Sequence, residues 1–473
     1  MPVCKLNKQP EKGICFFTGC HGIEYSSFGI LCGHFKEFAG LIIFFAILFG
    51  SCSSPRYFAG TRIADRFLDD PAVVDTHVGI ALYDSGMKKY IYTHNSDKFF
   101  VPASNTKLAT LYAGLKYLGD SIPGIQYSMH NDTIYLFPTG DPTFMLLDFS
   151  GQPVLDFLRG AEKPLVMIEP EHKTAALGYG WPWNFYLDYY MPERSPFPIY
   201  GNVIIWAQNN MAGLDDDVYV TYVSSYPRHP WPVEIRDGNE MKFEVRRPFN
   251  LNDYVVYPGL DDDRELFVPF VTNGMQAAHE LLNDTLKKDV GIETAAPAYL
   301  KKGLLLPGSG ISGFRDAGNH SGISGNPDYS GIVYSRPADS LFRPMMLFSD
   351  NFFAEQTLLM ISQKLFGVMD EGMLIEYLLE NDLADLPQNP RWVDGSGLSR
   401  YNLFTPESLV RLLEKMHAEF GSKRLNQLLP TGGEGTLGDY YLDVKGKIYA
   451  KTGTLEGNAV ALSGYIVTSG GRK

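Results

Sequence analysis

Three short motifs in this sequence combine residue types that could perform nucleophilic catalysis. They are Ser104-Asn105-Thr106-Lys107, Ser349-Asp350-Asn351 and Lys451-Thr452-Gly453. A serine hydroxyl is a poor nucleophile until a neighbouring base takes its proton. On a helix, side chains three residues apart lie on the same face, so Lys107 can reach Ser104. The first motif therefore predicts a nucleophile, Ser104, with its base, Lys107.

The second motif would assist this pair. A lysine amine acts as a base only when it is neutral, and we expect partial burial and a second cation, Lys451, to lower the pKa of Lys107. Ser349 is suited to relay a proton to a departing amine. Asn351 offers both a donor and an acceptor, which could fix Lys107 and a substrate amide.

The third motif is suited to bind a terminal carboxylate. Lys451, Thr452 and Thr454 present a cation and two hydroxyl groups on either side of Gly453. Backbone N–H groups on this segment and at Ser104 could form an oxyanion hole.

Each motif also has a purely structural explanation. Ser104 and Ser349 could be helix N-caps, and Lys107 could be a solvent-exposed helix lysine. Residues 451–453 could be the end of a strand that enters a turn. The order and context of the three motifs favour catalysis, because the first two open predicted helices and the third lies on a predicted strand near the C-terminus.

The surrounding sequence predicts the elements that position these motifs. Residues 77–84 and 89–93 flank a turn and predict a β-hairpin. Leucines at helical spacing follow Ser104, and the chain ends in two further β-like runs at 447–455 and 459–468. Further helices are predicted at 275–286, 340–346, 352–366 and 406–420. Between residues 124 and 325, short β-like runs alternate with turns, which predicts inserted β-rich subdomains.

Composition excludes several function classes. The net charge of −13 argues against nucleic-acid binding, which needs a basic face. All five cysteines lie within the first 52 residues, so the body of the protein can form neither a disulfide framework nor a thiolate metal site. We find no histidine or carboxylate spacing of the metal-ligand kind and expect no metal or cofactor.

The N-terminal segment, residues 1–52, resembles an export signal. Residues 41–49 are uninterruptedly apolar, too few to span a bilayer, and small residues lead directly to Cys52. This is the pattern of a bacterial lipoprotein signal with Cys52 as the acylated residue. It predicts an exported, periplasmic protein with a lipid anchor; the alternative is a buried apolar helix or strand near the terminus.

Over residues 60–473 the sequence resembles the class C low-molecular-mass penicillin-binding proteins. These are D-alanyl-D-alanine carboxypeptidase/endopeptidases of the peptidase S13 type, and the trio of motifs is their signature. The long separation of Ser104 and Ser349 matches this family, which inserts two domains there, and exceeds that of β-lactamases. Further segments that resemble the family lie at 140–143, 180–184, 349–355, 394–402, 429–430 and 435–437.

The resemblance implies an α/β (α+β) protein with a penicilloyl-serine-transferase (β-lactamase-like) domain, in which helices flank an antiparallel sheet. That catalytic domain would comprise residues 60–123 and 326–473, with the inserted subdomains at 124–325. The family's reaction would be cleavage of peptidoglycan peptides ending in D-Ala-D-Ala, and of cross-links, through an acyl-enzyme on Ser104. β-Lactam antibiotics would acylate the same serine, and residues 394–399 would border the site.

Two departures from the family affect the expectations. The family continues past the position of Lys473 with one more strand and a C-terminal helix, so we expect either that this sequence is a fragment or that its sheet has an exposed edge. Relatives also carry an acidic residue after the equivalent of Asn184, where this chain has Phe185. We expect Asp188 to supply that charge in binding the substrate.

Two other functions remain open at this stage. A β-lactamase would share the chemistry but would need a water molecule activated for fast deacylation. A non-catalytic homologue that binds the cell wall or an antibiotic would keep the fold without turnover.

Overall fold

The computed structural model describes residues 66–71, 73–212, 219–236, 242–260, 264–295, 297, 328–456 and 459–468. Residues 1–52, with the predicted signal and Cys52, lie outside the described residues. Among the helices that the structure does describe, none combines the length and the apolar character that crossing a membrane requires. The chain divides into two compact units, and the second, which includes residues 77–473, contains every element considered below.

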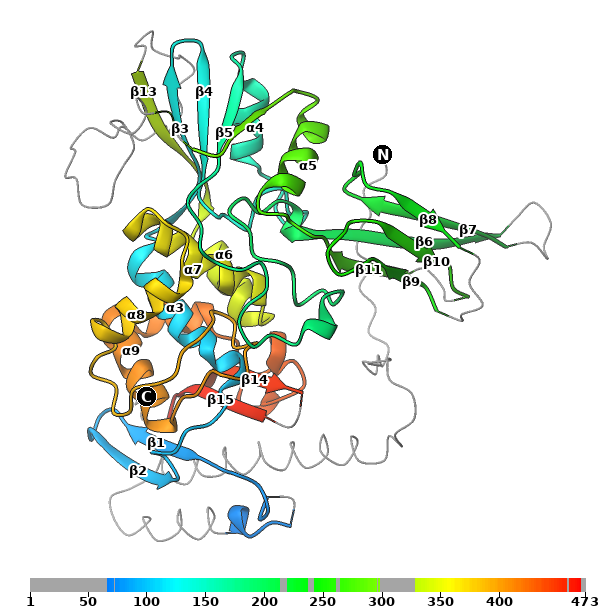
Figure 1. Cartoon of the computed structure of the whole chain (residues 1–473). Helices are drawn as coiled ribbons and strands as arrows, with labels where there is room; N and C mark the ends of the chain where they lie inside the picture. Colours follow the sequence, from blue (N-terminus) through cyan, green and yellow to red (C-terminus); the bar gives the residue numbers. More distant parts are fainter. Residues whose placement is uncertain are drawn as a thin grey trace. The chain divides into compact units, whose positions relative to one another are not determined.

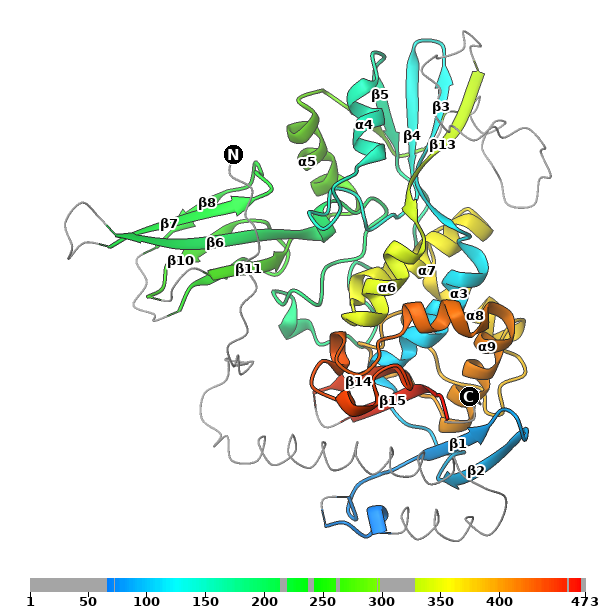
Figure 2. The ribbon, with the colours of Figure 1, turned by 180° about the vertical axis from the view of Figure 1, so that it is seen from behind.

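Five helices of this unit share one hydrophobic core (Figures 1 and 2). They are α3 (Lys107–Tyr117), α6 (Asp339–Leu347), α7 (Asn351–Phe366), α8 (Glu371–Glu380) and α9 (Pro406–Leu428). Most of α3 is buried, and a Cβ on its Gly114 would lie 2.5 Å from the ring of Phe342 on α6. The small residues of α3 thus let neighbouring helices approach closely, so the helix that follows Ser104 is held from several sides.

Two antiparallel strand pairs lie against these helices. The first, β1 (Ile80–Asp84) with β2 (Lys89–His94), is the hairpin predicted from the sequence. The second joins β14 (Ile448–Leu455) to β15 (Ala459–Ile466), with Lys451 opposite Ser463. Helix α9 contacts both β1 and β15. The result is the expected arrangement of antiparallel strands with helices against them.

The region between α3 and α6 is rich in β-structure. Its first part is a five-stranded sheet of order β12-β5-β4-β3-β13. The strands are β3 (Ser121–His130), β4 (Thr133–Pro138), β5 (Leu165–Ile168), β12 (Gly291–Glu293) and β13 (Asp328–Pro337). In both views, β3, β4, β5 and β13 lie side by side (Figures 1 and 2). Helices α4 (Pro153–Gly160) and α5 (Gln276–Leu286) contribute to the core that this sheet buries.

Two three-stranded sheets form the rest of this region, in the orders β11-β6-β7 and β8-β10-β9. Their strands are β6 (Val203–Ala212), β7 (Tyr219–Tyr226), β8 (Val233–Ile235), β9 (Glu244–Arg246), β10 (Tyr254–Tyr257) and β11 (Arg264–Pro269). Side chains from both sheets, among them Trp206 and Tyr254, join the same hydrophobic core as the five-stranded sheet.

The inserted sheet extends beyond residues 124–325 at both ends. Strand β3 begins at Ser121, and β13 ends at Pro337 after pairing antiparallel with β3. The sequence boundary at residue 326 would have assigned β13 to the catalytic domain. Pairing between strands so distant along the chain leaves no local pattern, which is why the sequence could not place these ends.

Candidate active site

The predicted nucleophile lies in a single helical turn that precedes α3. Ser104 is half-buried within η1 (Ala103–Thr106), and Lys107 is the first residue of α3. The Lys107 side chain is fully buried, and its Nζ lies 3.0 Å from the Ser104 Oγ. The structure therefore brings together the pair that the sequence predicted, and it excludes the explanation of Lys107 as a solvent-exposed lysine.

Two carbonyl oxygens fix the direction of the Lys107 amine. Its Nζ donates to Asn351 Oδ1 at 2.6 Å and to the backbone oxygen of Ser396 at 2.7 Å. A neutral amine has two N–H groups and one lone pair. When these two acceptors hold both N–H groups, the lone pair is directed at the Ser104 hydroxyl.

Burial lowers the pKa of Lys107 to about 8, because the charged form loses its hydration. The carboxylates of Asp394, Asp350 and Glu355 act in the opposite direction and raise it. The sequence-based prediction that the Lys451 charge lowers the pKa of Lys107 is therefore wrong. The effect runs in the other direction: burial and the positive charge of Lys107 hold the pKa of Lys451 well below its usual value.

The second motif connects the nucleophile to the third. The Ser349 Oγ accepts a hydrogen bond of 2.9 Å from Lys451 Nζ, and its backbone has a positive φ of 61°. Asp350 caps α7 by accepting from the backbone N–H of Phe353 at 2.8 Å. The amide nitrogen of Asn351 donates to the backbone oxygen of Tyr190 at 2.9 Å, which leaves its oxygen facing Lys107.

The third motif lies on β14, directly beside the nucleophile. A Cβ at Gly453 would lie 2.6 Å from the Pro102 oxygen and 3.0 Å from the Ser104 nitrogen. Only glycine lets the strand pass this close to the backbone of η1. Thr452 donates to the hydroxyl of Thr436 in η5 (Gly435–Leu437) at 2.7 Å, and Thr454 is exposed on the strand.

Asn105 ties the nucleophile turn to the strand pair, a role that the sequence analysis missed. Its side chain is fully buried, with the amide nitrogen 2.7 Å from the Lys451 oxygen and the amide oxygen 2.8 Å from the Ser463 hydroxyl. The only signal available in the sequence was its place inside the first motif.

The loop at 394–399 is organised by a buried carboxylate. Asp394 accepts from the backbone N–H groups of Gly397 at 2.8 Å and Ser399 at 2.7 Å, and from the indole of Trp181 at 2.9 Å. Gly397 has a φ of +83°, and a Cβ there would meet the Ala103 oxygen at 1.9 Å. The loop thus packs against the turn that carries Ser104. Its contact with the catalytic pair is the carbonyl of Ser396, and the side chains of both its serines are buried.

Asp188 lies near the C-terminal end of β14, close to Leu455 and Glu456. Its carboxylate accepts from the Tyr190 hydroxyl at 3.1 Å, and Tyr190 packs in a small apolar cluster with Leu455. Burial and the nearby Glu456 raise the pKa of Asp188. Phe185 packs in the same cluster, in the position where an acidic residue was expected.

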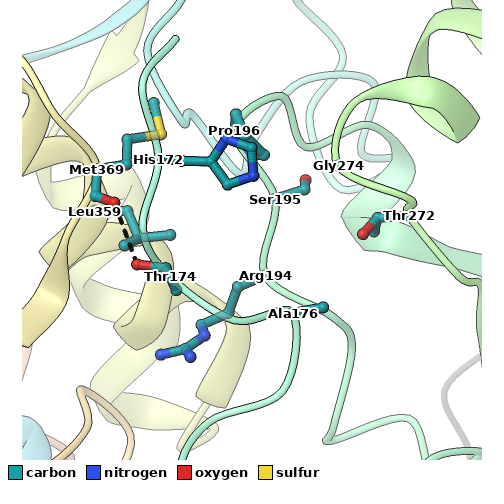
Figure 3. A pocket seen from close by; sticks show the side chains of 10 residues that line it. All are labelled: His172, Thr174, Ala176, Arg194, Ser195, Pro196, Thr272, Gly274, Leu359 and Met369. Carbon is teal, nitrogen blue, oxygen red and sulfur yellow. Dashed lines mark hydrogen bonds between the residues drawn. The ribbon is translucent and has the colours of Figure 1, made fainter. Parts of the chain in front are cut away.

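A cavity of about 70 Å³ lies apart from the three motifs (Figure 3). None of the motif residues lines it. Its walls are His172, Thr174, Ala176, Arg194, Ser195, Pro196, Thr272, Gly274, Leu359 and Met369. Within the described ranges, no group of histidine, cysteine, aspartate or glutamate side chains could hold a metal ion.

Comparison with known proteins identifies the family. The model of the D-Ala-D-Ala carboxypeptidase 3 (S13) family matches residues 61–302 and 328–473. The chain belongs to this family. The S13 assignment makes the protein a cell-wall peptidase, and it agrees with the arrangement of Ser104, Lys107 and the two other motifs.

This S13 peptidase is similar to characterised relatives. It is 26% identical to a D-alanyl-D-alanine carboxypeptidase of Actinomadura sp. (strain R39), over 85% of this chain and 77% of that protein. A segment covering 16% of each chain is 36% identical to penicillin-sensitive carboxypeptidase A of Dictyostelium discoideum. Its fold resembles penicillin binding protein 4 (dacB) of Haemophilus influenzae, with a TM-score of 0.61 and 20% identity over 83% of this chain and 88% of that one.

Proposed function

We propose that this S13 peptidase hydrolyses D-alanyl bonds in peptidoglycan stem peptides and cross-links through an acyl-enzyme on Ser104. The observation that carries the proposal is the buried Lys107 amine, which is held by two carbonyl oxygens so that its third direction meets Ser104. An unactivated serine in a helical turn would need no such arrangement.

In the acylation step, the Ser104 proton passes to the neutral Lys107 amine while Oγ attacks the carbonyl carbon of the scissile bond. Backbone N–H groups of Ser104 and β14 are suited to stabilise the oxyanion, because Gly453 brings the two backbones together. Ser349, hydrogen-bonded to Lys451, then relays a proton: its hydroxyl protonates the departing amine nitrogen and regains a proton from the Lys107 ammonium, which becomes neutral again. In the second step Lys107 takes a proton from water, the hydroxide attacks the ester, and the proton returns to the departing Ser104 oxygen. A β-lactam would form the same ester through its ring amide.

The third motif and the threonine that follows it would recognise the substrate. Lys451 and the hydroxyl groups of Thr452 and Thr454 provide a cation and donors for the terminal carboxylate. We assign Asp188 to the cationic end of a diamino-acid side chain, because its carboxylate accepts from the hydroxyl of Tyr190, the residue whose backbone oxygen accepts from Asn351. The relative from Actinomadura is named for its action on D-alanyl-D-alanine, which supports the proposed binding of a terminal carboxylate by the third motif.

The full-length protein is expected to release D-alanine from a peptide ending in D-Ala-D-Ala and to gain the mass of one drug molecule with penicillin. It should turn over a chromogenic cephalosporin at most slowly, because the acyl-enzyme persists. Chromatography of the released amino acid, intact mass and absorbance measure these three results. Rapid cephalosporin turnover would indicate a β-lactamase instead, and an adduct without D-alanine release would indicate an antibiotic-binding homologue.

We also propose export to the periplasm with lipid attachment at Cys52. The support is the apolar run at 41–49 followed by small residues and the cysteine, together with a substrate that lies outside the cytoplasmic membrane. A labelled fatty acid should be incorporated into the wild-type protein and not into Cys52→Ala. Equal labelling of the two proteins would contradict the assignment.

A further inference from the structure

A buried glutamate, Glu355, lies one helical turn after Asn351 on α7. The two residues are four positions apart, so their side chains lie on the same face of the helix. Asn351 contacts the Lys107 amine directly. Glu355 is 1% exposed, and its Oε1 accepts from the backbone N–H of Ser396 at 2.7 Å. The Ser396 carbonyl in turn accepts from Lys107.

The same face of α7 therefore supports both acceptors of the Lys107 amine. Asn351 is one acceptor, and Glu355 holds the residue that provides the other. The two peptides on either side of the Ser396 Cα are both held: Glu355 accepts from the Ser396 N–H of the first, and Asp394 accepts from the Gly397 N–H of the second, which contains the Ser396 carbonyl. The Ser396 carbonyl can turn away from Lys107 only if one of these two peptides moves. We infer that Glu355 is a positioning residue, which keeps the Ser396 carbonyl against the Lys107 amine and so directs that amine at Ser104.

The surroundings of Glu355 explain how a carboxylate is kept in this buried position. An unpaired buried carboxylate is strongly unfavourable. Here Arg194 Nη1 lies 3.2 Å from Glu355 Oε2 and 3.0 Å from Glu371 Oε1, and both the Arg194 and the Glu355 side chains are almost fully buried. Arg194 also donates to the Ala175 oxygen through Nε and Nη2. It is thus fixed in place before any substrate binds.

Arg194 and its neighbour Trp181 connect the inserted region to the loop at 394–399. The guanidinium lies 5.3 Å from the centre of the Trp181 ring, and the Trp181 indole donates to Asp394. Asp394 holds the other end of the loop that contains Ser396. Figure 3 shows Arg194 from the cavity side, beside Thr174 and Ala176. The loop is consequently held from two directions by residues that no motif includes.

Because Glu355 can carry a charge, its removal should change the pH at which Lys107 loses its proton, and this change can be measured. The ionisable groups that act on the pKa of Lys107 are the carboxylates of Asp394, Asp350 and Glu355, and Lys107 in turn lowers the pKa of Lys451. Asp394 and Arg194 face Glu355, and burial with the Asp394 charge raises the pKa of Glu355 to about 7. Above that pH Glu355 is mainly ionised and favours the charged form of Lys107. Removing the charge should therefore shift the deprotonation of Lys107 to lower pH.

The inference rests on the proposed function, and the rate constant of acylation by a penicillin, measured from pH 5 to 10, tests both. Glu355→Gln keeps an acceptor for the Ser396 N–H and loses the charge. The acid side of its profile should move down by about 0.5 pH unit, with the maximal rate within about threefold of wild type. Glu355→Asp keeps the charge, but its shorter side chain no longer reaches the Ser396 N–H, so its maximal rate should fall more than about tenfold. Glu371→Gln, which pairs with the same Arg194, is the matched control and should change neither quantity.

Each outcome decides the question. A wild-type protein that is not acylated would refute the proposed function itself. With wild-type acylation normal, an unshifted Glu355→Gln profile together with a full rate for Glu355→Asp would overturn the positioning role. If Glu355→Gln does not fold, as judged by near-ultraviolet circular dichroism, the Glu355→Asp rate decides. If neither Glu355 variant folds, the residue serves stability alone and the inference is wrong.

Discussion

Replacement of Ser104 by alanine is expected to abolish the penicillin adduct and to lower the rate of D-alanine release by at least about 10³-fold. The reason is that Ser104 Oγ is the hydroxyl that contacts the Lys107 amine, so no other group in the motifs can form the ester. The variant should still fold, because the half-buried Ser104 side chain contributes little to the core. Intact mass after incubation with penicillin measures the first effect, and chromatography of free D-alanine the second.

Ser121→Ala provides a matched control for this experiment. Ser121 is an exposed serine at the start of β3, outside all three motifs, and its replacement should leave the adduct and the release rate unchanged. If Ser104→Ala still gained the mass of one drug molecule, the nucleophile would have to be another residue. Peptide mapping of the adduct would then identify it.

Replacement of Lys107 by arginine is expected to lower the acylation rate by about 10³-fold at every pH up to 10. Arginine keeps the positive charge and the length of the side chain but does not give up its proton in this range. A purely electrostatic role for Lys107 would survive this change, whereas a role as base would not. Stopped-flow fluorescence with a penicillin analogue measures the rate constant.

The pH dependence of the wild-type protein provides the companion result. Because the pKa of Lys107 is lowered to about 8, roughly a tenth of the amine is neutral at pH 7 and roughly nine tenths at pH 9. The acylation rate constant should therefore rise about tenfold between these two values and then level off. A rate that is independent of pH, or an active Lys107→Arg variant, would show that another group is the base. Lys451 would then be the first to test, since burial also lowers its pKa.

The sequence by itself determined the local part of this protein. The spacing of Ser104 and Lys107 specifies a shared helical face, and the hairpin at β1 and β2 and the strands β14 and β15 follow from alternation and turn residues. These features depend on residues close together in the chain, so their patterns can be read directly. The order of the three motifs then specified the family and its chemistry.

Only the tertiary structure decided how the amine of Lys107 is held. One of its acceptors is the backbone carbonyl of Ser396. Every residue has such a carbonyl, so the sequence does not indicate which one accepts from Lys107. Glu355, the carboxylate that accepts from the N–H of Ser396, is paired with Arg194, a residue from the inserted region. The pairing of β13 with β3 was likewise hidden. Contacts of this kind depend on packing between segments far apart in the chain, which local patterns do not record.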